Sequence, residues 1–205
     1  MKTPSPKERR QARTRKAILE AAQEIISTDG TDALSMRAIA QRIDYSPAGL
    51  YEYFDGKEEI ITAVCEEGEK QLFALMDQVD KSLAPAEYLR DIGHAYIRFA
   101  MERPDHFLLM FSTPSLGQNE EEITGKSADS SAFGILLFAI RRGVEAGIFL
   151  LRPGLDLLTM AYAAWATVHG LAMLRATHLR DFPMDFDTAD RAALANFGRG
   201  LMAAE

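Results

Sequence analysis

Residues 35–57 read SMRAIAQRIDYSPAGLYEYFDGK and decide the fold of the N-terminal part of the chain. The segment predicts two short helices, the first of which begins after Ser35, a residue type that caps helix N-termini well. The second begins at Ser46 and Pro47, because proline at the first helical position gives up no hydrogen bond. The break between the helices falls at residues 44–45. Two short helices joined by a tight turn are typical of a helix-turn-helix unit.

This pair of helices is small and needs a third helix beside it. Upstream, apolar residues recur at helical spacing from about Thr14, and the run stops at Asp29 and Gly30, where glycine can adopt the left-handed conformation that ends helices. The apolar face consists of Ile18, Ala21, Ala22, Ile25 and Ile26. Because two of these side chains are small, the predicted helix can pack closely on the pair and fix its orientation.

The second helix of the pair, expected to end near Phe54, carries few bulky side chains that would keep it out of the major groove of DNA. Its N-terminal amides can also meet phosphate oxygens. Arg37 is the best candidate for a guanine contact, because the bidentate guanidinium–guanine pair is the commonest specific pairing, and a phosphate contact is the alternative. The predicted interface with double-stranded DNA consists of Ser35, Arg37, Ser46, Pro47, Ala48, Gly49, Tyr51, Tyr53 and Lys57.

Charge is distributed unevenly along the chain. The 205 residues carry a formal net charge of −7, which by itself argues against a nucleic-acid partner. Residues 1–57, however, hold ten Lys and Arg against eight Asp and Glu, whereas residues 58–205 hold thirteen against twenty-two. Residues 1–16 are the most basic, with seven Lys and Arg and one Glu. This basic arm suits phosphate contact, and a solvated tail is the alternative interpretation.

Helical spacing continues through the rest of the chain, and the alternating pattern of strands is almost absent. We expect Asp55 to begin a long helix through a capping box with Glu58. Pro85 is expected to begin the next helix, and Pro104 to separate it from a short one. Residues 112–128 are polar and rich in turn-forming residue types, which predicts a loop.

Three more helices are predicted towards the C-terminus. The first starts around Asp129 and ends at Gly147, the second covers about residues 155–178, and residues 185–188 offer caps for the last. The fold is therefore predicted to be all-α with about nine helices. Residues 1–57 form the three-helix domain with its basic arm, and residues 58–205 form a larger helical bundle.

The run from residue 17 to residue 61 resembles the N-terminal domain of the TetR family of bacterial regulators. It combines an Ala/Ile helix ending in Asp-Gly, the pattern Leu-Ser-x-Arg-x-Ile-Ala at residues 34–40, and the pattern Ser-x-x-x-Leu-Tyr-x-Tyr-Phe-x-x-Lys-Glu at residues 46–58. The turn departs from the family, which usually has glycine there. Asp44 tolerates the left-handed conformation better than most residues, so we expect the turn to form, although its charge would weaken DNA affinity.

The resemblance implies that the remaining helices form a ligand-sensing and dimerising domain. The last two helices of each subunit would make a four-helix interface, and an unidentified small-molecule effector would bind within the domain. Residues 155–178 fit this role, because the predicted helix is apolar almost all round and needs burial on more than one side. A partner subunit would supply the second surface, and complete burial inside a monomer is the alternative.

Trp165 and His169 lie one helical turn apart on a common face, and Gly170 allows close helix approach. The three resemble the Trp-His-Gly signature of one type of TetR C-terminal domain. Trp165 and His169 are predicted to line a ligand pocket, and a hydrogen-bonded core histidine is the alternative. The other pocket candidates are Tyr96, Phe99, His106, Phe107, Met110, Phe111, Phe133 and Tyr162. Plain core packing is the alternative for all of these.

The sequence predicts neither a metal site nor another cofactor, because the histidines lack metal-ligand spacing. The single cysteine, Cys65, is expected to be a small core residue without a redox role. Residues 1–16 lack the apolar run of a signal peptide, and no stretch reaches 18 uncharged apolar residues. We therefore expect a cytoplasmic protein without a membrane partner.

The favoured function is a dimeric TetR-like transcriptional regulator, a repressor that binds operator DNA and is released by a small-molecule effector. A helical ligand- or protein-binding module that no longer binds DNA specifically is the alternative, and the acidic turn residue Asp44 is its main support. An enzyme is not expected. The sequence shows no Gly-rich phosphate loop, nucleophile elbow or paired set of metal ligands.

Overall fold

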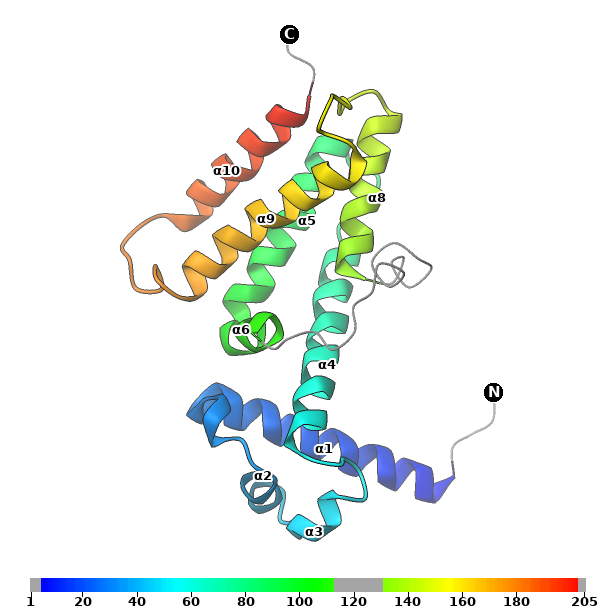
Figure 1. Ribbon diagram of the computed structural model, residues 1–205, viewed down its shortest axis with the longest axis vertical. Helices are drawn as coiled ribbons and strands as arrows, with labels where there is room; N and C mark the ends of the chain where they lie inside the picture. The colour runs from blue at the N-terminus through cyan, green and yellow to red at the C-terminus, as the bar shows by residue number, and fades with distance from the viewer. Residues whose placement is uncertain (1–4, 113–130, 203–205) are drawn as a thin grey trace.

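The computed structural model describes residues 5–112 and 131–202, which form helices and connecting loops without a β-strand. This part of the chain holds nine α-helices: α1 (Pro6–Asp29), α2 (Met36–Arg42), α3 (Pro47–Leu50), α4 (Lys57–Asp77), α5 (Pro85–Glu102), α6 (Pro104–Ser112), α8 (Ala132–Glu145), α9 (Leu157–Ala176) and α10 (Phe186–Leu201). Helices α1 to α3 form a small unit at one end, and α4 runs from this unit into a larger bundle (Figure 1). The predicted all-α architecture is confirmed.

Helices α1, α2 and α3 pack around a core of their own. Ile18 of α1, Ile39 of α2 and Leu50 of α3 are fully buried in it. The first turns of α4 add Ile60 and Val64 to the same core. The N-terminal core therefore extends beyond residue 57, and α4 contributes side chains to both parts of the molecule.

The helix-turn-helix forms with its unusual turn, but α3 ends at Leu50 and not near Phe54 as predicted. Residues 51–53 form turns instead, in which the Tyr53 N–H donates to the Leu50 carbonyl at 2.9 Å. Asp44 has a φ of 51° and is the one non-glycine residue with positive φ in the described part of the chain. The Tyr45 N–H donates to the Ala40 carbonyl at 2.9 Å and closes the turn. The hydroxyls of Ser35 and Ser46 cap the two helices, accepting hydrogen bonds from backbone N–H groups at 3.1 and 3.0 Å.

Helix α1 begins earlier than predicted, at Pro6 instead of near Thr14. Ser5 and Glu8 form a capping box, in which the Ser5 hydroxyl accepts from the Glu8 N–H and the Glu8 carboxylate accepts from the Ser5 N–H. Hydrogen bonding to Ser5 lowers the pKa of the Glu8 carboxyl group. The basic arm is thus helical from Pro6 onward.

The predicted capping box of Asp55 with Glu58 is wrong. Helix α4 starts one residue later, with Gly56 at the N-cap position and no side-chain cap. Glu59 accepts the Asp55 N–H at 2.5 Å instead. The helix therefore starts one residue later than predicted, and Glu59 instead of Glu58 is the residue whose carboxylate accepts a backbone N–H at its start.

The other predicted helix ends are found. Pro85 starts α5, Pro104 starts α6, and Gly147 has positive φ just after α8. The Asp185 carboxylate caps α10 by accepting the Thr188 N–H at 3.1 Å. The predicted loop at residues 112–128 and the helix start near residue 129 lie outside the described residues except for residue 112. Helix α8 begins at residue 132 in the described part.

Helix α5 lies at the centre of the larger bundle and packs against α4, α8, α9 and α10. Helix α9 crosses in front of it in Figure 1, α10 lies beside α9, and α6 lies at the end of the bundle nearest α1. Leu109 of α6 is buried in the N-terminal core, whereas Phe107 of the same helix is buried in the core of the bundle. Helix α6 therefore joins the two cores.

The end of α8 depends on close contact between Gly143 and Phe149. The Phe149 ring is 1% exposed, and a Cβ atom on Gly143 would lie 2.0 Å from its Cδ2 atom. The Gly143 carbonyl also accepts the N–H groups of Ile148 and Phe149 at 2.9 and 3.0 Å. Only glycine at this position leaves room for the ring.

Replacing Gly143 by alanine should lower the free energy of unfolding by about 1–3 kcal/mol, the typical cost of forcing an extra methyl group into a packed core. Urea denaturation measures the change. Phe149→Leu makes room for the methyl group, so Gly143→Ala should cost less in that background than in the wild-type chain. An equal cost in both backgrounds would contradict the steric explanation.

Candidate functional site

Most of the predicted DNA-contact residues lie at the surface of the small unit. Tyr51, which directly follows α3, is 56% exposed. The others that are exposed are Ser35, Arg37, Ser46, Pro47 and Ala48. Gly49, Tyr53 and Lys57 are half-buried. The N-terminal turn of α3 thus faces solvent with small side chains, as a helix entering the major groove requires.

Gly49 makes room for an aromatic contact at the turn. The rings of Tyr45 and Tyr53 meet edge to face with centroids 6.4 Å apart. A Cβ atom on Gly49 would lie 2.6 Å from the Tyr45 Cε1 atom. Sequence reasoning treated Tyr45 only as a turn residue and missed this contact. The Tyr45 ring helps to hold α3 against the residues that follow it.

Two basic side chains of the small unit make internal contacts. The Arg15 guanidinium lies over the Phe54 ring, 4.1 Å from its centroid, and donates to the Tyr53 carbonyl at 3.2 Å. The Lys57 ammonium donates to the Thr31 carbonyl at 3.3 Å. Arg15 therefore supports the helix-turn-helix from α1, and Lys57 ties the start of α4 to the loop before α2.

The first turns of α1 carry the remaining charge of the basic arm. Lys7, Arg10 and Arg13 are exposed there. A hydrogen bond with Tyr53 raises the pKa of the Tyr45 hydroxyl, and the charge of Arg10 opposes this shift. The positive charge of the arm therefore acts on the turn of the helix-turn-helix.

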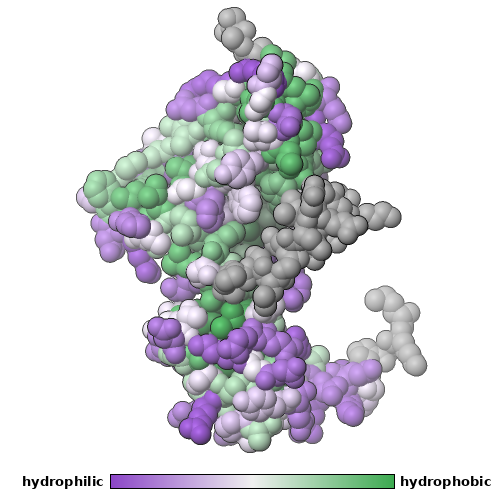
Figure 2. All heavy atoms as spheres, in the orientation of Figure 1, coloured by the Kyte–Doolittle hydropathy of each residue, from purple (hydrophilic) through white to green (hydrophobic). Residues whose placement is uncertain are grey.

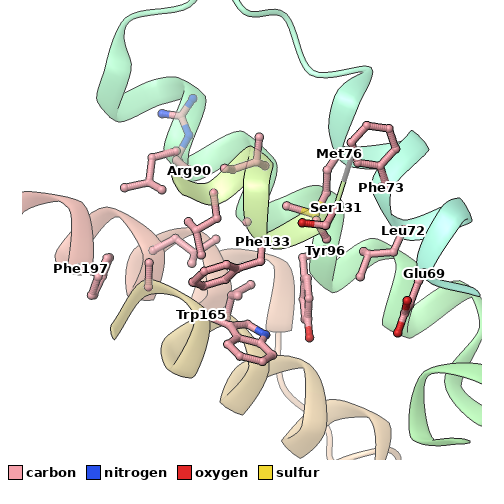
Figure 3. A pocket seen from close by; sticks show the side chains of 18 of the residues that line it. Glu69, Leu72, Phe73, Met76, Arg90, Tyr96, Ser131, Phe133, Trp165 and Phe197 are labelled. Atoms are coloured by element: carbon pink, nitrogen blue, oxygen red, sulfur yellow. The ribbon is translucent and has the colours of Figure 1, made fainter. Parts of the chain in front are cut away.

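A cavity of about 570 Å³ lies within the larger bundle, a size typical of small-molecule sites. Residues of α4, α5, α6, α8, α9 and α10 all contribute to its wall, and Figure 3 shows the labelled side chains converging from several helices. Five of the ten predicted pocket residues line it: Tyr96, Met110, Phe111, Phe133 and Trp165.

The other five candidates lie elsewhere. Phe99 and Phe107 are buried in the core. His169 supports the wall from behind, because its Nδ1 atom lies 2.9 Å from the Tyr96 hydroxyl. His106 contacts the Val64 carbonyl and faces a separate hollow of about 150 Å³. Tyr162 is 66% exposed, because α9 turns this residue away from the bundle.

The polar groups behind the cavity are uncharged at neutral pH. Burial raises the pKa of the Tyr96 hydroxyl, and a hydrogen bond with Trp165 opposes the shift. Burial lowers the pKa of His169 below its ordinary value near 6.5. The Tyr96–His169 pair therefore offers a neutral hydrogen-bonding edge within an aromatic wall.

Sequence reasoning missed the charged residues of the wall. Glu66, Glu69 and Lys70 come from α4, and Arg90 comes from α5. The three α4 residues lie within four positions of one another, so they share one side of the helix. Their spacing could be read from the sequence, but charged residues on one helix face are more often solvated than part of a cavity wall. All three side chains remain exposed, and the packing of α8 and α6 beside α4 places them at the mouth of the cavity.

Two family models match the chain. Residues 18–64 match the bacterial regulatory proteins of the tetR family, and residues 89–197 match the tetracyclin repressor-like C-terminal domain. The second match alone takes in more than half of the 205 residues. The first contains the whole helix-turn-helix, and the second contains most of the helices around the cavity.

Individual relatives agree with this. The HTH-type transcriptional regulator YobS of Bacillus subtilis is 30% identical over 46% of this chain, and the chain spans 49% of that protein. The HTH-type transcriptional regulator Rv0681 of Mycobacterium tuberculosis is 26% identical over 85% of this chain and 74% of its own length.

Solved structures show the same fold. The TetR family transcriptional regulator PfmR from Thermus thermophilus matches with a TM-score of 0.66 and 28% identity, over 91% of this chain and 99% of that one. A protein of unknown function from Rhodococcus matches with a TM-score of 0.77 and 24% identity, over 92% and 95%. The chain belongs to the TetR family of DNA-binding transcriptional regulators, which is not a family of enzymes.

Proposed function

We propose that this protein is a homodimeric repressor that acts in the cytoplasm and releases operator DNA when a small molecule fills the cavity. The observation that carries the proposal is the double role of α6. Leu109 is buried in the core of the DNA-binding unit, and the next two residues, Met110 and Phe111, line the cavity. A ligand that displaces the cavity side of α6 therefore acts directly on the helix that supports the DNA-binding unit.

A second contact of α6 lies next to the first. The His106 Nε2–H donates to the Val64 carbonyl of α4 at 2.8 Å. Gly68, one turn further along α4, is close enough that a Cβ atom there would lie 2.5 Å from the Met110 sulfur and 2.6 Å from His106 Nε2. This close packing makes α4 and α6 move together, so a change at the cavity reaches the start of α4 as well.

The dimer is proposed to form through α9 and α10. Leu158, Tyr162 and Leu174 of α9 are 50%, 66% and 48% exposed. With Ala166 and Gly170 they form a row at four-residue spacing that winds slowly around the helix, which we call the α9 row. A Cβ atom on Gly170 would meet nothing within 4 Å in the single chain. A glycine facing open space fits a position where a partner helix approaches closely.

The composition of α9 points the same way. Among the helices of the described residues, α9 is the one that is long and apolar enough to cross a membrane, by length and composition alone. In the single chain, 28% of its most apolar 18-residue stretch is buried. Figure 2 shows apolar residues spread over this face of the bundle and hydrophilic residues concentrated on the small unit. A second copy of α9 and α10 would cover the exposed apolar side chains.

DNA binding is tested with the region upstream of the gene in a gel-shift assay at low salt, since phosphate contacts weaken steeply with salt. Arg37→Ala and Tyr51→Ala should each weaken binding by about 1–3 kcal/mol, roughly 5- to 150-fold. Arg42→Ala is the matched control, because Arg42 is paired with Glu24 and Asp29 within the small unit.

The same assay separates two roles of Arg37. A guanine contact predicts that Arg37→Ala weakens binding to the operator more than binding to unrelated DNA, whereas a phosphate contact predicts equal weakening. Full affinity in both the Arg37 and Tyr51 variants would contradict the proposed DNA interface. It would favour a helical module that does not bind DNA specifically.

Dimerisation is tested by placing charges in the α9 row. Tyr162→Glu combined with Leu174→Glu should convert the dimer to a monomer in sedimentation velocity, because two carboxylates per subunit would be buried without partners. Phe138→Glu is the control, since Phe138 is 46% exposed on α8. A dimer that survives the double substitution would contradict the proposed interface.

The state of His106 makes stability depend on pH. Burial lowers the pKa of His106, although the hydrogen bond to the Val64 carbonyl opposes the shift. The unfolded chain therefore binds a proton more readily, and the free energy of unfolding should fall as the pH drops below about 6.5. His106→Gln keeps an N–H donor without a titrating group and should reduce this loss. Urea unfolding at pH 7.5 and 5.8 measures both, and an unchanged pH dependence in the variant would contradict this role of His106.

A further inference from the structure

We propose that the cavity takes a hydrophobic organic monocation, a quaternary or protonated amine attached to an apolar body. This inference rests on the proposed effector function and names the chemical class of the effector. It is carried by the cavity itself, by the arrangement of charge along its wall and by the aromatic side chains between its ends.

One end of the cavity is acidic. Glu66, Glu69 and Lys70 of α4 are exposed and line the mouth of the cavity, so this end carries one excess negative charge. Within the described part of the chain neither glutamate makes a hydrogen bond or a salt bridge. Burial and the charge of Glu66 raise the pKa of the Glu69 carboxyl group, and Lys70 opposes the shift. A cationic ligand would supply the opposite charge that the protein leaves out at this end.

Of the two basic residues of the wall, Lys70 lies at the acidic end beside the glutamates, whereas Arg90 lies elsewhere and is paired. Arg90 is at the opposite end of the labelled group from Glu69 (Figure 3), and its Nε atom lies 2.8 Å from the Asp91 carboxylate. His169, behind the wall, is neutral at physiological pH because burial lowers its pKa. An anionic head group would therefore find Lys70 next to two glutamates and one arginine that already has a partner, and the net negative charge of the acidic end would repel it.

Much of the wall is aromatic. The rings that line the cavity are Phe73, Tyr96, Phe111, Phe133, Trp165 and Phe197. Of the rings labelled in Figure 3, those of Phe133, Trp165 and Tyr96 lie between Arg90 and Glu69. Phe133 and Trp165 lie with centroids 5.8 Å apart, and Tyr96 and Phe111 with centroids 6.3 Å apart. Ring faces attract cations, most strongly that of tryptophan, and the attraction grows where water is excluded. The same rings offer apolar contact to the body of the ligand.

The chain carries its own reporter for this test. Trp165 is the single tryptophan and lines the cavity, so its fluorescence responds to a ligand bound there. The probes are decyltrimethylammonium, decanoate and decanol, all below the concentrations at which they form micelles. They share an alkyl chain and differ in charge. The full-length protein is titrated with each, and operator DNA binding is measured in parallel.

The cation should change the fluorescence saturably and bind about tenfold or more tightly than either analogue. Glu69→Gln, and separately Glu66→Gln, should weaken binding of the cation while leaving that of decanol unchanged. Glu87→Gln, an exposed substitution on α5 outside the cavity wall, should change neither. Circular dichroism checks that each variant is folded.

Equal binding of the three probes, tighter binding of decanoate, no saturable response to the cation, or equal affinity of the cation for wild type and both glutamate variants would overturn the inference. The DNA assay tests the proposed function separately. If decanoate or decanol binds and releases DNA, the effector function stands and the cationic class fails. If the cation binds as predicted but DNA stays bound, the cavity chemistry stands and the release mechanism fails.

Discussion

The arrangement of the molecule depends on the burial of α6 against the DNA-binding unit. Without Leu109 in the N-terminal core, that unit would be joined to the bundle through α4 alone, and a single helix leaves its orientation weakly determined. Burying one leucine stabilises by about 1.5–3 kcal/mol, which is a large part of the net stability of a small domain. The same contact makes the two parts interdependent, because the residues after Leu109 belong to the cavity wall.

The helix-turn-helix and its turn could be predicted from the sequence, because they follow from local rules, although several helix ends around them were placed wrongly. Serine caps, a proline at the first helical position and an aspartate that tolerates positive φ each act over a few residues. Asp44 is the clearest case: its φ of 51° is the conformation expected for the turn. Where local signals competed, as at Asp55 and Gly56, the predicted register was wrong by one residue. The early start of α1 was missed because Ser5 and Glu8 were not considered as a capping pair.

The cavity was predicted less well, since no local rule determines which side chains from six helices converge. Tyr96, Phe111 and Trp165 line it. Phe99 and Phe107 are also aromatic and also follow helical spacing, but they are buried in the core instead. Tyr162 differs from Trp165 by less than one helical turn and points outward. The charges on α4 were overlooked for the same reason, because their place at the mouth of the cavity depends on the helices packed beside α4, although their side chains stay exposed.

The packing of Tyr45 against Gly49 restricts how a protein of this design can change its target sequence. While the Tyr45 ring lies against position 49, a Cβ atom there would come 2.6 Å from its Cε1 atom, so a side chain at this position requires the ring to move. In the proposed DNA interface, position 49 lies in the helix that enters the major groove, and the exposed Arg37, Ala48 and Tyr51 are free to vary. A new specificity that needs a side chain at position 49 would therefore depend on displacing the Tyr45 ring, which couples the two positions.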